Sequence, residues 1–130
     1  MSPRSRRGAA AIETALVVPV VLLITLGLMD WSWLMYRWHT VEASAMRGVR
    51  LLGGDPDLGG LDERAREEVD AHLRAFGVDP ADATVRAEVE ERPYGPIVTV
   101  TVTVDVEPLI GVGHGRRQVV AVASGPWYAQ

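Results

Sequence analysis

The chain has 130 residues, enough for one modest domain or for a long helix joined to a small domain. It is 48% hydrophobic and 23% charged, which excludes a disordered or collagen-like protein. The sequence contains no cysteine, so disulfides, thiolate metal sites and a cysteine nucleophile are excluded. The formal net charge of −4 argues against a general nucleic-acid binder.

The charge is divided unevenly along the chain. Residues 1–50 carry six arginines against three acidic residues, a net charge of +3. Residues 51–130 carry seven arginines against fourteen acidic residues, a net charge of −7. A basic start, an apolar run and an acidic remainder predict a membrane anchor followed by a soluble domain.

The N-terminal region predicts the anchor itself. Residues 9–29 follow a short basic stretch and are apolar apart from one glutamate and two threonines. A bilayer core of ~30 Å needs about 20 helical residues, which this run supplies. Four aromatic residues follow directly, as expected at a membrane interface: Trp31, Trp33, Tyr36 and Trp38. The basic N-terminus should stay cytoplasmic, so residues beyond about 35 should be exported.

A cleaved secretory signal peptide is the alternative interpretation of this run. It requires a small-x-small cleavage site just after the apolar residues. Residues 30–33 read Asp-Trp-Ser-Trp, which is a poor site, and Ala43-Ser44-Ala45 lies too far downstream. The sequence therefore favours an anchor that stays on the protein.

Two residues inside the run depart from a simple anchor. Pro19 cannot donate a hydrogen bond to Ala15, which predicts a kink, although membrane helices also tolerate proline without any functional reason. Glu13 places a charge in an apolar segment, where it costs roughly 2.5–3.5 kcal/mol at the membrane centre and little near the interface. The surrounding residues favour a function for Glu13 over a tolerated surface charge.

Residues 6–13 read Arg-Arg-Gly-Ala-Ala-Ala-Ile-Glu, so basic residues precede Gly8 and Glu13 stands fifth after it. This pattern resembles the processing signal of type IV prepilins. The resemblance implies that a membrane aspartyl peptidase, the prepilin peptidase, cuts the Gly8–Ala9 bond and leaves the apolar helix on the mature protein. It also implies an assembly role for Glu13, which would pair with the freed Ala9 ammonium of another subunit.

The longer stretch from Gly8 to Gly53 resembles the TadE-like minor pilins and pseudopilins of tight-adherence (Flp-type IV) pili. Their pattern has a glycine, small residues, a glutamate and then a proline, as in Gly8, Glu13 and Pro19. Their helix ends in an Ala/Arg-rich segment before a glycine, as residues 41–53 do. Thr14 departs from the pattern, because the family often has an aromatic residue there.

One helix should extend well beyond the anchor. Six residues recur at heptad spacing: Leu34, Trp38, Val41, Ala45, Gly48 and Leu52. We expect a continuous helix over residues 9–52, roughly 65 Å long, that stops with Gly53 in the C′ position. The heptad stripe can pack on the protein's own domain or on partner helices, and its own domain is favoured after about residue 40.

The remainder predicts a small α+β domain. Residues 53–60 form a loop by composition. Residues 61–76 form an amphipathic helix that ends at Gly77, with an apolar face made of Leu61, Ala65, Val69, Leu73 and Phe76. Residues 85–89, 98–106 and 118–124 are expected strands, with a turn over 93–96. The predicted product is a three-stranded antiparallel sheet whose valine face is covered by both helices. Trp127 and Tyr128 are expected to dock the C-terminal tail.

No constellation of residues predicts catalysis. His39, His72 and His114 are scattered without metal-ligand spacing, so we expect no metal, no cofactor and no enzymatic activity. Residues 111–115 predict a glycine-rich flexible loop. The unusually apolar residues 108–112 could either fold back onto the core or contact another subunit, and the sequence leaves both open.

The sequence thus predicts four segments in an α+β protein. These are a cytoplasmic basic leader over 1–8, a transmembrane helix over 9–35, its continuation over 36–52 and an exported domain over 53–130. The family resemblance implies a minor pilin or pseudopilin of a tight-adherence pilus. Its implied partners are the membrane, other pilin subunits, the pilus assembly platform and a prepilin peptidase, but not nucleic acid. The alternative is a generic single-pass membrane protein with a small exported protein-binding domain.

Overall fold

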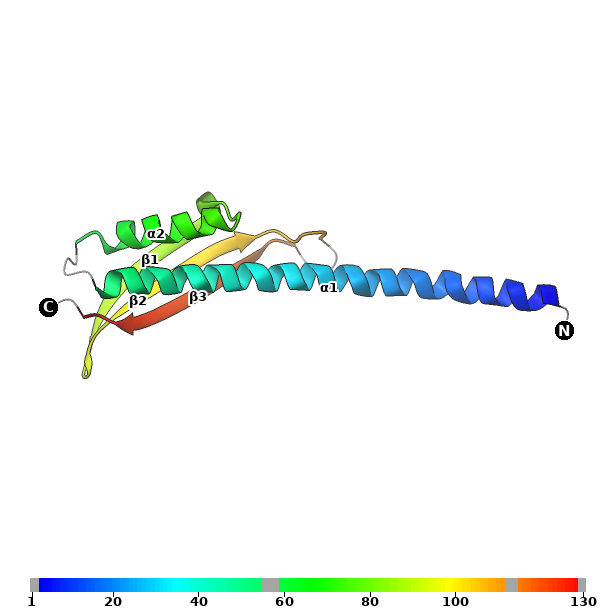
Figure 1. Ribbon diagram of the computed structural model, residues 1–130, viewed down its shortest axis with the longest axis horizontal. Coiled ribbons are helices and arrows are strands. Elements are labelled where there is room, and N and C mark those ends of the chain that lie inside the picture. The colour runs from blue at the N-terminus through cyan, green and yellow to red at the C-terminus, as the bar shows by residue number, and fades with distance from the viewer. Residues whose placement is uncertain (1–2, 55–58, 112–114, 129–130) are drawn as a thin grey trace.

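The computed structural model describes residues 3–54, 59–111 and 115–128. The described elements, in chain order, are α1 (Pro3–Gly53), α2 (Leu61–Ala75), the short 3-10 helix η1 (Pro80–Asp82), β1 (Ala83–Arg92), β2 (Gly95–Val106) and β3 (Arg117–Pro126). Figure 1 shows both long helices on one face of the sheet, with the N-terminal half of α1 projecting far beyond it. The predicted α+β class is confirmed. Residues 55–58 of the predicted loop, and residues 112–114 with His114, lie outside the described residues.

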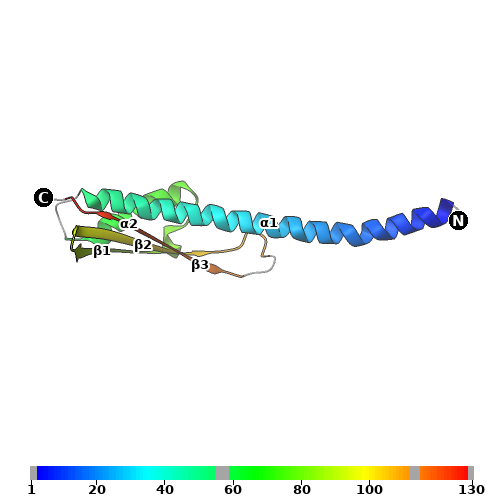
Figure 2. The same ribbon diagram turned by 90° about the horizontal axis from the view of Figure 1, so that it is seen from below.

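Helix α1 is continuous over its 51 residues. It begins at Pro3 instead of the expected Ala9, because proline is well suited to a first helical position and nothing between it and the apolar run breaks a helix. It also includes Gly53, so the turn begins one residue later than predicted. Pro19 lies inside the helix without ending it, and Figure 2 shows a gentle bend in the projecting half.

The C-terminal half of α1 packs on its own domain. Four members of the heptad stripe are buried in the core: Val41, Ala45, Gly48 and Leu52. Leu34 packs against the edge of this core. Trp38 does not follow the stripe and is 47% exposed, because it lies beside the start of β3 and not over the middle of the sheet. The prediction that the stripe packs on the chain's own domain after residue 40 is confirmed.

The sheet has the strand order β1-β2-β3, and both pairs are antiparallel. Arg92 pairs with Gly95, which leaves Pro93 and Tyr94 as a two-residue hairpin loop. Alternate valines of β2 face the helices and are buried: Val98, Val100, Val102, Val104 and Val106. The period-two pattern of the sequence therefore predicted both the strand and its buried face.

Helix α2 is amphipathic, as predicted, but one aromatic side chain differs from expectation. Phe76 was predicted on the apolar face, yet it follows the last helical residue and is 45% exposed. His72 lies on α2 and is buried, and the centroid of its ring lies 4.7 Å from that of the Phe76 ring. At the other end of α2, Asp62 Oδ1 accepts a hydrogen bond from the N–H of Ala87 at 2.6 Å, which covers part of the outer edge of β1.

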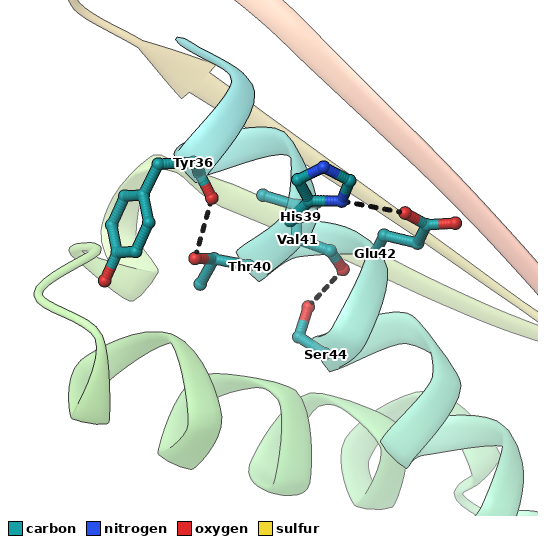
Figure 3. A network of polar contacts seen from close by, with 6 residues as sticks. All are labelled: Tyr36, His39, Thr40, Val41, Glu42 and Ser44. Carbon is teal, nitrogen blue, oxygen red and sulfur yellow. Dashed lines mark hydrogen bonds and ion pairs between the residues drawn. The ribbon is translucent and has the colours of Figure 1, made fainter. Parts of the chain in front are cut away.

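The packing between α1 and its neighbours is close. A Cβ added to Gly48 would lie 3.2 Å from a methyl of Val100 in β2 and 3.5 Å from a methyl of Val69 in α2. Two buried hydroxyls also belong to this half of α1, those of Thr40 and Ser44. Figure 3 shows each of them turned back onto a carbonyl oxygen of its own helix, at 3.0 Å and 2.6 Å. Their hydrogen-bonding groups are therefore satisfied without a partner from another element.

The C-terminal tail is docked through its backbone. The N–H of Trp127 donates to the carbonyl of Pro96 at 3.0 Å, and that of Tyr128 donates to the carbonyl of Gly53 at 2.7 Å. The ring of Tyr128 is exposed. The predicted docking is confirmed, and it ties the tail to the end of α1.

Candidate functional site

The sequence-predicted processing and assembly residues all lie near the start of α1. Gly8 is exposed, and a Cβ added to it would meet nothing within 4 Å. Glu13 is also exposed and belongs to the N-terminal half of α1. Ala9 and Glu13 are four residues apart in a helix, so these two positions lie one turn apart on the same face. The structure therefore brings the candidate cleavage site and the candidate assembly residue onto one short stretch of helix.

The rest of this projecting half is apolar and uncovered. Among the described residues, α1 is the one helix long and apolar enough to cross a membrane, and its most apolar window is not buried by any part of the domain. Both threonines of the run donate hydrogen bonds to carbonyls of their own helix, Thr14 to Ala10 at 2.9 Å and Thr25 to Val21 at 2.8 Å. Glu13 is the single acidic residue between positions 9 and 29.

A second polar site marks the end of the apolar run. Asp30 is only 1% exposed, and its Oδ1 accepts a hydrogen bond from the N–H of Ile110 at 2.7 Å. Ile110 belongs to the segment that follows β2, so this bond fastens the β2–β3 loop to α1. Residues 108–111, the described part of this apolar segment, thus fold back onto the chain's own helix, which was one of the two possibilities left open by the sequence. The side chains of Leu109 and Ile110 nevertheless stay 50% and 43% exposed.

Sequence reasoning counted Asp30 as a charge and gave it no role. A visible signal was its position, an acidic residue between an apolar run and an aromatic cluster. Its partner was not visible, because the two residues are 80 positions apart and the carboxylate accepts from a backbone N–H, which every residue type except proline supplies.

The aromatic cluster beyond Asp30 links α1 to the domain. The rings of Trp33 and Tyr36 stack with centroids 5.9 Å apart, and the Arg37 guanidinium carbon lies 4.3 Å from the centroid of the Trp33 ring. Arg37 Nη1 also donates to the carbonyl of Gly77 at 2.9 Å. The arginine therefore joins the aromatic cluster to the end of α2 by a cation–π contact and a hydrogen bond.

An open hollow of about 410 Å³ lies next to this cluster, lined by acidic and basic side chains. Within its lining, Arg116 Nη2 donates to Glu107 Oε1 at 2.6 Å, and this hydrogen bond raises the pKa of Arg116 above its ordinary value. Within residues 3–54, 59–111 and 115–128, no group of three histidine or acidic side chains is placed to hold a metal ion. The hollow offers charged walls without a nucleophile paired to a base.

The two described histidines, His39 and His72, lie apart from each other in different surroundings, one exposed and one buried. His39 is exposed and lies 3.6 Å from Glu42 on the next turn of α1 (Figure 3). Burial lowers the pKa of His72, nearby Arg47 lowers it further, and Glu68 acts in the opposite direction. In the described part of the chain, His72 Nε2 has no hydrogen-bond partner, as suits a neutral ring in an apolar setting.

These features define a class of protein: a small α+β domain carried at one end of a long helix, whose other end is an apolar candidate membrane span. Residues 8–50 match the model of the family described as TadE-like protein. The match confirms the resemblance over these residues and indicates a protein associated with tight-adherence pili. Residues 51–130 lie outside it, and the chain matches no curated protein and no solved structure.

Proposed function

We propose that the protein is a minor pilin or pseudopilin-like assembly subunit of a tight-adherence pilus, anchored by α1 and processed by a prepilin peptidase. One observation carries the proposal. The N-terminal half of the helix segment that matches the TadE-like family projects from a folded domain as an exposed apolar rod and bears Gly8 and Glu13 near its start. Such a rod needs a lipid or protein environment, since exposed apolar side chains are unfavourable in water.

The orientation follows from charge. Three arginines without an acidic residue precede the apolar run, Arg4, Arg6 and Arg7, and the acidic domain follows it. In the proposed arrangement the N-terminus is cytoplasmic and the domain is extracytoplasmic. The bond between Gly8 and Ala9 then lies on the cytoplasmic side, where the prepilin peptidase would act.

Cleavage requires the start of α1 to open. Proteases bind extended backbone, whereas Gly8 is helical in the structure. Helix ends fray easily, and glycine lowers helix stability by roughly 0.5–1 kcal/mol relative to alanine. Gly8 therefore marks a point where the first turns of α1 can unwind at low cost. In this account the structural role of the glycine is local opening and access to a narrow protease cleft.

Glu13 supplies the assembly contact in the same account. After cleavage the ammonium of Ala9 and the carboxylate of Glu13 would face the apolar interior of a helix bundle. Pairing between neighbouring subunits satisfies both charges and sets how far one helix is displaced along the next. No metal, cofactor or catalytic group is needed for this role.

The test of processing is the mass and N-terminal sequence of the membrane-extracted protein from cells with an active prepilin peptidase. We expect a mature chain that begins at Ala9. Gly8→Val should block cleavage, because a branched side chain obstructs entry of the extended backbone to the cleft. Gly27→Val, at a second α1 glycine with nothing within 4 Å of its added Cβ, is the matched control and should be cleaved normally. A wild-type chain that begins at Met1 favours the generic single-pass membrane protein instead.

A further inference from the structure

We propose that Leu109 and Ile110 form a membrane foot: they insert into the lipid–water interface of the bilayer that α1 spans, while Asp30 holds them against the helix. The inference rests on the proposed membrane anchoring of α1. It adds a second contact between the protein and the bilayer, made by the domain itself. The partner is the lipid surface.

The first argument is the position of the segment that follows β2, which contains Leu109 and Ile110. Figure 1 shows the end of the sheet where β2 stops and β3 begins lying beside α1, on the side of the projecting half. The hydrogen bond between Asp30 and Ile110 sets this loop at the level where the apolar run ends. An anchor that spans residues 9–29 therefore brings the loop to the membrane surface.

The second argument is the exposed apolar surface formed by the side chains of Leu109 and Ile110 with those of α1. Leu109 lines a shallow hollow of about 400 Å³ together with four residues of α1: Met29, Ser32, Trp33 and Tyr36. Leu109, Ile110, Met29 and Trp31 are all substantially exposed. The apolar surface of the candidate span thus continues without a charged break onto the loop. Leucine and isoleucine at such a level gain by entering the interface, beside aromatic side chains that favour it.

Three charged groups at this level, Asp30, Glu107 and Arg116, are buried or paired. Arg117, at the start of β3, is exposed beside them. Asp30 would be costly against lipid as an open carboxylate, but it is 1% exposed and holds a backbone N–H. Glu107 and Arg116, which flank the loop, neutralise each other through their 2.6 Å contact. A surface with apolar tips and neutralised flanks is suited to lipid, whereas nothing in it selects a partner of defined charge.

With the foot, the protein contacts the bilayer at two points, through α1 and through the domain. The helix alone would let the domain rotate and tilt about the point where α1 leaves the bilayer. A second contact on one side of the helix fixes which face of the domain lies on the membrane. Asp30 is a positioning residue in this scheme, because it acts through the backbone of Ile110.

The test uses single-cysteine variants, since the natural chain contains no cysteine. The full chain is placed at one copy per phospholipid nanodisc, and each variant carries one nitroxide label. The measured quantity is the ratio of label accessibility to oxygen, which is enriched in lipid, and to a water-soluble nickel chelate. Leu109→Cys reports the foot. Leu22→Cys reports the candidate span, and Tyr94→Cys reports the hairpin loop of the fully exposed Tyr94.

We expect the ratio at position 109 to be severalfold above that at position 94 and closer to that at position 22. An aqueous label at 109 with a lipid label at 22 overturns the foot and leaves the anchor standing. Aqueous labels at both positions overturn the anchoring, and with it the proposed function. A label at 109 that is protected only after other pilin subunits are added shows a subunit contact and overturns the lipid assignment.

The role of Asp30 is tested by substituting it in the labelled variants and measuring the accessibility of the same labels. Asp30→Ala should return the 109 label to water without changing the label at 22. Asp30→Asn keeps an acceptor oxygen of the same shape and should hold the 109 label in lipid. If Asp30→Ala leaves the 109 label in lipid, the fastening by Asp30 is wrong.

Discussion

At the residue scale, two carboxylates on α1, those of Glu13 and Asp30, have different surroundings and different roles. Glu13 is exposed on the projecting half of α1 and is free to meet another chain. Asp30 is buried where the apolar run ends and serves its own fold through Ile110. The same chemical group thus has an intermolecular role in our proposal for Glu13 and an observed intramolecular role at Asp30, because burial and the nearest donor differ.

The Glu13→Ala variant should separate assembly from folding. Glu13 belongs to the N-terminal half of α1, which projects beyond the domain (Figure 1), so the stability of the domain should not change. Loss of a carboxylate at membrane level should ease insertion by up to about 2–3 kcal/mol. The freed Ala9 ammonium would lose its partner, and breaking a buried pair costs roughly 3–5 kcal/mol. We therefore expect the variant to be processed and membrane-bound but missing from sheared filaments.

The amount of the variant in sheared filaments and in pull-downs of partner pilins is the measurement. Thr25→Ala is the control, because it also removes a polar group from the apolar run and should assemble normally. Normal recovery of Glu13→Ala in both assays would reduce Glu13 to a tolerated surface charge.

His72 predicts a pH dependence of stability. Its pKa is lowered in the folded protein, chiefly by burial and then by Arg47, while Glu68 opposes the shift. Above about pH 6.5 the ring is neutral in both folded and unfolded chains. As the pH falls below that value, the unfolded chain takes up a proton first, so the free energy of unfolding decreases.

Urea denaturation of the detergent-solubilised protein between about pH 7.5 and pH 5.5 measures this loss. His72→Gln should remove the part due to this ring, whereas His39→Gln, at the exposed histidine of α1, should retain it. An identical pH dependence in the wild type and in His72→Gln contradicts the assignment.

At the scale of elements, the predictable features were those that repeat. The alternating valines of β2 predicted its span and buried face, and the unbroken run up to Gly53 predicted one long helix. Trp38 and Phe76 were assigned wrongly to apolar stripes, because periodicity does not show where the sheet beneath a helix ends. The contact between Asp30 and Ile110 was not predictable, since it joins distant positions through a backbone donor.

Gly48 should tolerate a large side chain poorly. A Cβ there already meets Val100 at 3.2 Å, so Gly48→Leu overpacks the junction of both helices with β2. The expected cost is about 1–3 kcal/mol, seen as a lower thermal midpoint of the sheet signal in circular dichroism. Gly27→Leu is the matched control, because its added Cβ meets nothing within 4 Å. Equal midpoints for the two variants would show that the helix can withdraw from the sheet at little cost.

The whole molecule is a rod with a domain on one half. The C-terminal half of α1 packs into the protein's own core. Its buried stripe is therefore not available to partner helices. The projecting half has no such cover, and the TadE-like match extends along both halves. This division suits a subunit that joins an assembly through its N-terminal helix and presents its domain outside the bundle.

The most direct measurement of the central claim is photo-crosslinking from the projecting half in living cells. A photoreactive amino acid replaces Leu16, which is exposed on this half one turn after Ile12. The same amino acid at Tyr94, in the distant hairpin loop, is the control. We predict that the Leu16 variant crosslinks to other pilin subunits in cells that assemble the pilus, and that the control does not. Leu16 crosslinks confined to lipid, with none to a pilin, would contradict the account.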